Sequence, residues 1–421
     1  MLLALALALA LVACDPTEPT VQKTGAHMAR STKRGVAFNF SQTSDLPLLS
    51  SAICWDYNWG NSTNDNSALW FDANDIEYCP MCWNGNYNAD KIRAYVAAHP
   101  STKYLLGFNE PNLTDQANMT PAQAAAIWPQ VVALARELNL KLVSPAMNYG
   151  TLAGYSDPVK WLDEFFAQPN VDINDIDAIS VHCYMASASA LQGYIEKFRK
   201  YNKPVWLTEF CAWDPKPSSA EVQMDYMCAA LHYLENEPLV ERYAWFIPRY
   251  TSKNNDPHMQ LITNEIPGEL TDAGKLYCGF STFDTETYLN TEWIPAGSYC
   301  AISGATPNLR PATDTHLSGL DWPLMIKNIA PGMTQEYKVV LTKETAHFLI
   351  RTAGYTDALV RVFVDNEEVV TTTVARTGGS DNWTTTSCAL SEAQQPSKGC
   401  HTVRLEWLSG NILFSAFSFK E

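Results

Sequence analysis

Eight short apolar runs alternate with helix-like segments between residues 35 and 247, and this alternation limits the chain to few folds. The runs are rich in β-branched and aromatic residues and lie at 35–40, 51–59, 75–83, 104–110, 141–148, 178–184, 204–210 and 240–247. Strands that alternate with helices are typical of parallel sheets. Eight such repeats over about 250 residues predict an α/β protein with a (β/α)8 TIM barrel. An open doubly wound sheet is the alternative, but no glycine-rich phosphate loop follows an early run.

Several segments between these runs carry helix start signals. A capping box with proline at the first helical position begins at Thr120, and Asp157 precedes a second proline-led helix. Ser218 and Glu221 form a similar box before a third helix. A last helix is expected at about residues 271–281, after the eighth run. These signals support the alternation of strands and helices.

The pattern changes after about residue 285, where the helical periodicity ends. Alternating strands are expected at residues 336–341, 347–353, 358–365 and 401–408, separated by Gly, Asp, Asn and Ser. Short alternating strands with such turns are typical of an antiparallel β-sandwich. The chain is therefore divided into a barrel domain at 34–284 and a C-terminal β-sandwich at 290–421.

The N-terminus predicts export from the cytoplasm. Residues 1–14 read as a signal peptide, too short for a membrane-spanning helix, and end in Leu-Val-Ala-Cys, which resembles a bacterial lipobox with Cys14 as the lipidated residue. A plain secretory signal is the alternative. Residues 15–33 are polar and read as a tether. We expect an extracytoplasmic protein, secreted or on the cell surface, that contacts a membrane only through a lipid on Cys14.

Ten cysteines follow Cys14, and their even number in an exported protein favours disulfide bonds. Cys388 and Cys400 flank one short polar loop and are the favoured pair. Cys79 and Cys82 form a CxxC that is also compatible with a redox or zinc half-site. No second CxxC or paired His motif accompanies it, so no metal site is predicted.

The charge balance restricts the partners of the protein. The chain has 45 Asp and Glu against 29 Lys and Arg, a formal net charge of −16. Nucleic acids and anionic lipid surfaces require clustered positive charge, so this composition argues against both. A neutral partner such as a polysaccharide is permitted, and we expect a monomer without cofactors.

Two of the eight runs end in glutamate. The fourth ends in GFNEPN with Glu110, and the seventh ends in WLTEF with Glu209. In barrel enzymes the chemistry lies where the strands end. Glycoside hydrolysis requires two carboxyl groups flanking the anomeric carbon, one as acid and one as nucleophile or base. The pair therefore predicts a glycosidase, whereas neither GxSxG nor HExxH is present to suggest serine or metal chemistry.

The motifs around these glutamates are similar to those of a known family. Asn-Glu on strand four with Glu on strand seven resembles clan A of the retaining glycoside hydrolases. Within that clan the sequence resembles glycoside hydrolase family 128 most closely, in the segments KRGVAFNF, CWDYNWG, YLLGFNEPN, LVSPAMNYG, ISVHCYM, KPVWLTEFCAW and RYAWF. The resemblance covers residues 33–283 and implies activity on β-1,3-glucan by a retaining double displacement, which we expect to be endo-acting.

The resemblance also implies roles for individual residues. Glu110 would be the acid/base and Glu209 the nucleophile, with Asn109 binding the sugar 2-hydroxyl. His182 and Tyr184 would line the site and orient Glu209, and Trp245 would form the floor under the scissile sugar. Tryptophan faces stack on pyranose rings, so four further tryptophans at strand ends are candidate sugar platforms: Trp55, Trp59, Trp83 and Trp213.

The segment from about Thr291 resembles carbohydrate-binding modules of family 6, on motifs that include IPAGSYCAISG and HTVRLEWLSGNILFSAFSF. This resemblance implies sugar contacts at Trp383 and Asn411. Trp383 stands in a polar, glycine-containing loop, which favours exposure over core packing. A sandwich that merely stabilises the barrel is the alternative, and no metal is expected here.

Two rival functions stay open at this point. Another clan A β-glycanase, acting on β-1,4-glucan or mannan, would use the same two glutamates. A surface protein that binds glucan without cleaving it is the second rival, although such a protein has no need for both Glu110 and Glu209.

Overall fold

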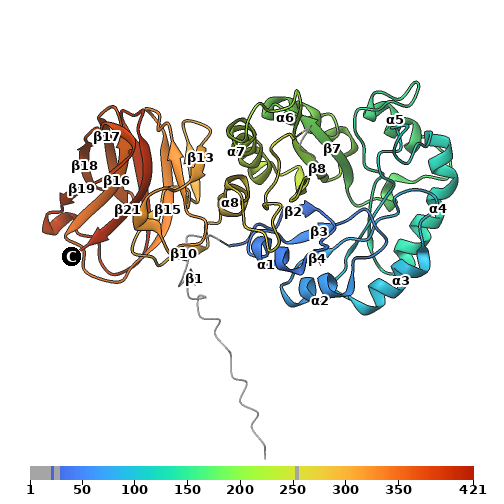
Figure 1. Cartoon of the computed structure of the whole chain (residues 1–421), viewed down its shortest axis with the longest axis horizontal. Helices are drawn as coiled ribbons and strands as arrows, with labels where there is room; N and C mark the ends of the chain where they lie inside the picture. The colour runs from blue at the N-terminus through green and yellow to red at the C-terminus, as the bar shows by residue number, and fades with distance from the viewer. Residues whose placement is uncertain (1–19, 23–28, 252–255) are drawn as a thin grey trace, which may run out of the picture.

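The computed structural model describes residues 20–22, 29–251 and 256–421. The chain has a mixed α/β part and a β-rich part, which lie side by side in Figure 1. The predicted signal peptide, the lipobox and Cys14 lie outside the described residues. Among the residues described, no helix combines the length and the hydropathy needed to cross a membrane.

Eight parallel strands form the centre of the α/β part, and each predicted run overlaps one of them. They are β2 Arg34–Ala37, β3 Trp55–Tyr57, β4 Glu77–Tyr78, β5 Tyr104–Leu106, β6 Lys141–Val143, β7 Ile179–Met185, β8 Val205–Asp214 and β9 Val240–Trp245. Six of them pair in the order β4-β3-β2-β9-β8-β7, and β5 pairs with β6. Single bridges at Met81–Leu106 and Val143–Ala178 connect the two sets. Parallel pairing thus passes through all eight strands and returns to the first.

Helices lie between these strands, as the alternation predicts. They are α1 Leu46–Leu49, α2 Asp65–Ala73, α3 Ala89–Ala98, α4 Pro121–Glu137, α5 Pro158–Phe166, α6 Ala188–Glu196, α7 Ala220–Asn236 and α8 Asp272–Gly279, with short 3-10 turns at Thr43–Asp45, Ile173–Asp175 and Arg199–Tyr201. Thr120 forms the predicted capping box with Gln123, and Asp157 caps α5. The cap of α7 is Ser219 and not Ser218, because the extended Ser219 accepts the backbone N–H of Val222.

Aromatic side chains close the end of the ring at which the strands begin. The guanidinium of Arg242 lies 4.5 Å from the ring centre of Trp206 and 4.6 Å from that of Tyr104. It also pairs with Glu77 at 2.7 Å. A buried cation is stable here because it has both a carboxylate and aromatic faces as partners. The opposite end, where the strands finish, is the end left for a substrate.

The β-rich part contains two sheets, drawn in orange and red in Figure 1. Its strands are β10 Thr287–Leu289, β11 Ile294–Pro295, β12 Ala301–Ser303, β13 Asn308–Pro311, β14 Leu324–Lys327, β15 Thr334–Leu341, β16 His347–Gly354, β17 Ala358–Val364, β18 Glu367–Val374, β19 Gly379–Ala389, β20 Gly399–Trp407 and β21 Leu413–Lys420, with 3-10 turns at Thr315–Leu317 and Glu392–Gln394. One sheet has the order β1-β10-β15-β20-β17-β18, and the other β13-β14-β21-β16-β19. Apart from the parallel β1 and β10 pairings, these ladders are antiparallel, as predicted.

The structure describes part of the predicted tether at 15–33. Thr20–Gln22 form β1, which pairs in parallel with β10. The Arg30 side chain donates to the carbonyl oxygens of Asn74 at 2.7 Å and Asp75 at 2.9 Å. These loop carbonyls give the guanidinium partners that a free tether would lack, so the end of this segment packs on the α/β part.

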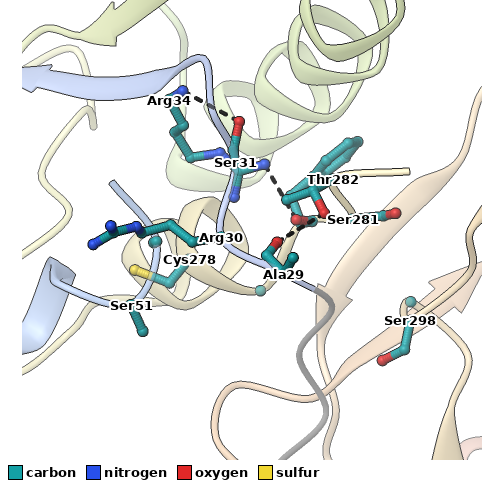
Figure 2. Close-up of a pocket in the computed structure, with 13 residues that line it drawn as sticks. Ala29, Arg30, Ser31, Arg34, Ser51, Cys278, Ser281, Thr282 and Ser298 are labelled. Atoms are coloured by element: carbon teal, nitrogen blue, oxygen red, sulfur yellow. Dashed lines mark hydrogen bonds between the residues drawn. The ribbon is translucent and has the colours of Figure 1, made fainter. Parts of the chain in front are cut away.

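The two parts are joined by an ion-pair cluster in which a buried arginine meets two exposed acidic residues. Arg310 on β13 pairs with Asp225 at 2.6 Å and Glu221 at 2.8 Å, both on α7, and is only 4% exposed. A cavity at the same junction is lined by residues from both parts, among them Ser31, Cys278 and Ser298 (Figure 2). Its volume of about 20 Å³ holds about one water molecule, so it is no substrate site.

The disulfide prediction is wrong in this structure. All ten cysteines in the described residues are free, including Cys79, Cys82, Cys388 and Cys400. Cys388 lies on β19 and Cys400 on β20, and these strands belong to different sheets. Their loop crosses from one sheet to the other, so closeness in sequence does not bring the thiols together. Cys79 and Cys82 are buried, and burial raises the pKa of both thiols.

Candidate active site

An aromatic cleft of about 690 Å³ lies at the end of the ring where the strands finish. It is lined by Trp59, Trp83, Asn109, Glu110, Leu113, Gln116, Asn148, Tyr184, Glu209, Trp213, Phe246 and Ile247. Ligand clefts of this size are mostly apolar with a few converging polar groups. The two glutamates are the carboxylates in this lining, so the cleft combines sugar-stacking surfaces with acid–base groups.

Backbone pairing brings the two glutamates to the same place. Glu110 follows β5 by four residues, and its N–H donates to the carbonyl of Ala146 after β6 at 3.0 Å. Its φ of 43° is in the left-handed region, which is unusual for glutamate and frequent at functional sites. Glu209 lies on β8, opposite His182 on β7, and β8 continues to Asp214 rather than ending at the glutamate. Glu110 and Glu209 are 6% and 4% exposed.

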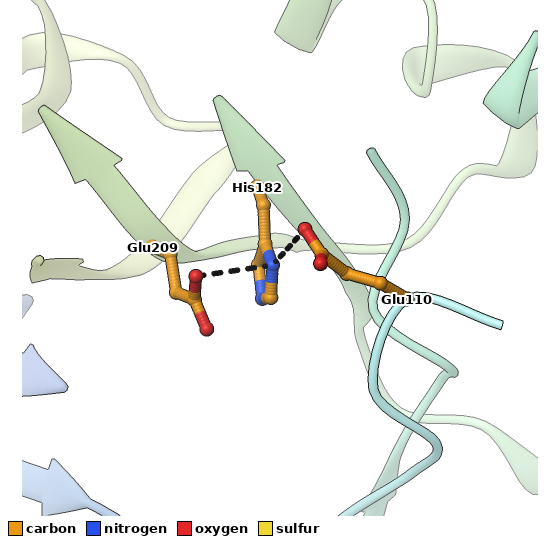
Figure 3. Close-up of side chains that lie close together, drawn as sticks. All are labelled: Glu110, His182 and Glu209. Carbon is orange, nitrogen blue, oxygen red and sulfur yellow. Dashed lines mark hydrogen bonds and ion pairs between the residues drawn. The ribbon is translucent and has the colours of Figure 1, made fainter. Parts of the chain in front are cut away.

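The imidazole of His182 lies between the two carboxylates (Figure 3). Its Nδ1 is 2.9 Å from Oε1 of Glu110 and 3.4 Å from Oε2 of Glu209. Burial raises the pKa of Glu110, but the hydrogen bonds from His182 and Asn148 and the nearby imidazole charge outweigh it, so this pKa lies below its ordinary value. Burial lowers the pKa of His182, but the two carboxylates outweigh it and raise this pKa above its ordinary value.

Glu209 accepts hydrogen bonds from three aromatic side chains. The Tyr57 hydroxyl donates to Oε1 at 2.9 Å and the Trp59 indole N–H donates to the same oxygen at 2.7 Å. The Tyr184 hydroxyl donates to Oε2. Burial and the neighbouring glutamate charge raise the pKa of both tyrosines well above the ordinary value, so both hydroxyls stay protonated donors. Fixed donors of this kind hold a carboxylate in one orientation.

Most of the residues predicted for this site lie in it. Asn109, Tyr184, Trp59, Trp83 and Trp213 line the cleft with the two glutamates, and His182 is buried directly behind them. Two of the predicted tryptophans are not in the cleft.

The predicted sugar contacts of Trp55 and Trp245 are wrong. Both side chains are 0% exposed and belong to the core. Trp55 begins β3 whereas Trp59 follows the end of that strand, so Trp55 lies deeper in the ring, and its indole donates to the carbonyl of Lys33. Trp245 is on the outer face of β9 and packs against Tyr277 of α8. Side chains alternate along a strand, so its neighbour Phe246 faces the cleft instead.

Sequence reasoning missed three contributors. Tyr57 and Phe246 are two of them, although Tyr57 lies only two residues before Trp59 and its ring contacts that indole. Asn148 donates to Oε1 of Glu110 at 2.9 Å. It belongs to the segment LVSPAMNYG, where its place after β6 was the available signal.

The cluster of Glu110, His182 and Glu209 also has the donor types of a metal site. One donor atom from each lies within 4.8 Å of the others. In the structure these groups contact one another, since His182 Nδ1 lies 2.9 Å from Glu110 and 3.4 Å from Glu209.

The residues predicted for the C-terminal module occupy separate positions. Trp383 lies on β19, half-buried, and its indole donates to Thr313 Oγ1 at 3.0 Å. Asn411 is exposed in the turn before β21, with a φ of 75° and its carbonyl accepting from Thr356. Neither residue lines the cleft, so any sugar contact they make is independent of the glutamates.

Comparisons with known proteins agree with this geometry. The family model of the glycosyl hydrolase catalytic core matches residues 35–277, more than half of the chain. A solved endo-β-1,3-glucanase of glycoside hydrolase family 128, subgroup II, from Pseudomonas viridiflava is 39% identical with a TM-score of 0.54, covering 59% of this chain and 98% of that one. Its counterpart from Sorangium cellulosum is 35% identical with a TM-score of 0.53, covering 58% and 97%.

Among curated proteins, alkali-sensitive linkage protein 1 of Schizosaccharomyces pombe is 30% identical over 245 residues. The match covers 55% of this chain but only 41% of the yeast protein, so the chain spans about two fifths of that relative. The matches cover the α/β part, which holds the cleft and both glutamates. The chain belongs to the glycosyl hydrolase catalytic core family, and its α/β part is of the family 128 type.

Proposed function

We propose that this protein is a retaining, endo-acting β-1,3-glucanase whose α/β part is a (β/α)8 barrel. The main support is that Glu110 and Glu209 converge in an aromatic cleft. A carboxylate oxygen of Glu110 lies within 4.8 Å of a carboxylate oxygen of Glu209. Carboxyl groups about 5–5.5 Å apart are typical of retaining glycosidases, whereas inverting enzymes need about 6.5–9.5 Å to admit water. Substrate choice is supported by the relatives from Pseudomonas viridiflava and Sorangium cellulosum, both endo-β-1,3-glucanases.

The mechanism follows from the contacts of each glutamate. Glu209, held by Tyr57, Trp59 and Tyr184, attacks the anomeric carbon. Glu110 protonates the glycosidic oxygen as its bond to that carbon breaks, which leaves a covalent glycosyl-enzyme. Glu110 then takes a proton from water, and the water oxygen displaces Glu209 with the original configuration restored. Glu209 is the better nucleophile because three fixed donors define its orientation.

The cleft walls favour a neutral, pyranose-based chain. Trp59 and Trp213 line the cleft beside Phe246, with ring centres 5.9 Å and 6.3 Å from it, and Trp83 adds to the lining. Aromatic faces stack on the apolar faces of sugar rings, and the described residues that line the cleft include no Lys or Arg to bind an anionic polymer.

A substrate panel tests this function. The full chain should release oligosaccharides of mixed length from laminarin and curdlan, and at least about 100-fold less from cellulose or mannan, which corresponds to about 2.7 kcal/mol of discrimination. Product length is measured by chromatography. Comparable rates on β-1,4-linked polymers would favour another clan A glycanase, and binding without any product would favour a non-catalytic glucan-binding protein.

We also propose that the C-terminal module binds insoluble glucan through Trp383 and Asn411. The half-buried Trp383 in a polar stretch supports this role. In the same panel, Trp383→Ala should lower activity on insoluble curdlan severalfold and leave activity on soluble laminarin unchanged. Equal losses on both polymers would assign the module to stability alone.

The remaining features are proposals on the sequence alone. An extracytoplasmic monomer, secreted or carried by a lipid on Cys14, would meet its polysaccharide outside the cell. Fractionation of cells and the mass of the mature N-terminus test the location and the anchor.

A further inference from the structure

One ring nitrogen of His182 contacts both glutamates. Figure 3 shows the Glu110 and Glu209 carboxylates converging on this imidazole from opposite sides. The contacts are 2.9 Å and 3.4 Å, and the ring is completely buried. An ionised carboxylate only accepts hydrogen bonds, so a proton must lie on Nδ1 or on the Glu110 oxygen facing it. The hydrogen bond between His182 Nδ1 and Glu110 Oε1 therefore contains one proton, which either atom can carry.

The surrounding charges favour keeping this proton. Two ionised carboxylates so close together in a cleft repel each other, and a cationic His182 reduces the net charge of the three groups from −2 to −1. The other partners of the glutamates are neutral donors: Tyr57, Trp59 and Tyr184 on Glu209, and Asn148 on Glu110. These neutral groups stabilise the ionised carboxylates, but they carry no positive charge and do not supply the proton for the reaction.

The second nitrogen of His182 shows which interactions favour or disfavour the cationic form of the ring. Nε2 is buried and makes no hydrogen bond to any residue that the structure describes. Burial therefore disfavours the cation, and only the two carboxylates favour it. Their combined effect outweighs burial, since the pKa of His182 is raised and that of Glu110 is lowered. At neutral pH the resting site thus holds Glu110 ionised, although its proposed first task is to donate a proton.

We propose that His182 stores, in the resting enzyme, the proton that Glu110 delivers to the leaving group; this role rests on the proposed two-glutamate function. The proton moves from Nδ1 to Oε1 of Glu110 and leaves a neutral imidazole. Glu110 gives a proton to the glycosidic oxygen while the bond from Glu209 to the anomeric carbon forms. In the second step Glu110 takes a proton from the attacking water and returns it to Nδ1. One water is consumed and the proton count is restored.

The test reads the protonation of His182 directly, by NMR of the full chain labelled with ¹⁵N-histidine. His182→Gln assigns the signal, and His232 on α7 serves as the internal reference, because it packs against Phe283 and has no carboxylate partner within the described part of the chain. Just below the ordinary imidazole value of 6.5, both nitrogens of His182 should carry protons. In Glu110→Gln, the proton affinity of His182 should fall at least about tenfold, because one carboxylate is lost.

Trapping separates this role from a structural one. A 2-deoxy-2-fluoro glucosyl fluoride should leave one sugar on Glu209, seen as a mass increase. The ester removes the Glu209 charge, so the proton affinity of His182 should then fall. A neutral His182 in the free enzyme, an unchanged affinity in Glu110→Gln, or an unchanged affinity after trapping would each overturn the proposal. Failure to gain mass would count against the glycosidase mechanism instead, and the free-enzyme titration would still decide the state of His182.

Discussion

Replacing Glu209 with alanine should lower kcat on laminarin by about 10⁴-fold or more, because no other group can form the bond to the anomeric carbon. Glu209 lies in the cleft with three aromatic donors on its oxygens, and Glu110 is occupied by His182 and Asn148. The substitution removes the nucleophile and leaves the acid in place.

The rate is measured as reducing ends released over time, with circular dichroism to show that the fold is retained. Glu209→Gln keeps the side-chain volume and should be equally inactive, whereas Glu367→Ala, at an exposed position on β18, should match the wild type. Laminarin hydrolysis by Glu209→Ala within tenfold of the wild-type rate would remove Glu209 from the nucleophile role.

Replacing Glu110 with alanine should lower kcat on laminarin by about 10²- to 10⁴-fold, the usual contribution of a general acid. A sugar leaving group needs protonation, whereas dinitrophenolate does not, so the first step on a dinitrophenyl glucoside should be much less affected. Its glycosyl-enzyme should then accumulate, because no base activates water.

Azide needs no general base and should restore turnover of this variant, giving a β-glycosyl azide. The variant is followed by burst kinetics with and without azide, and Asn148→Ala serves as the matched variant that leaves Glu110 present but removes one of its donors. Equal losses on laminarin and the activated substrate, with no azide effect, would contradict the acid/base role.

The arrangement of strands and helices could be predicted because it depends on periodicity. The eight runs overlap β2 to β9, and the cap at Thr120 is visible in the sequence as a proline-led capping box. The two glutamates were predictable for the same reason. Parallel strands finish at one end of the ring, so an acid after strand four and an acid in the later part of strand seven converge there.

Whether an individual tryptophan side chain points into the cleft or into the core could not be predicted from the sequence. A strand in a closed parallel ring is buried on both faces, so its sequence is apolar throughout and carries no alternation to separate inside from outside. Trp245 and Phe246 are equally apolar, yet only Phe246 reaches the cleft. Trp55 is on the same face as Trp59, but its depth in the ring depends on where the strand starts.

The cysteine prediction failed for a different physical reason. Counting thiols assumes that the fold needs covalent links, but this chain has a large apolar core in which most cysteines act as small buried side chains. The free Cys388 and Cys400 show that loop length alone does not place two side chains together when their strands belong to different sheets.

The configuration of the first product tests the two-glutamate mechanism most directly. Proton NMR of laminarin digestion, recorded before mutarotation, reports the anomer released at the new reducing end. Attack by Glu209 followed by attack of water inverts the carbon twice, so the β-anomer should appear first and the α-anomer only later. An α-anomer at the earliest times would show a single displacement by water and contradict a covalent role for Glu209.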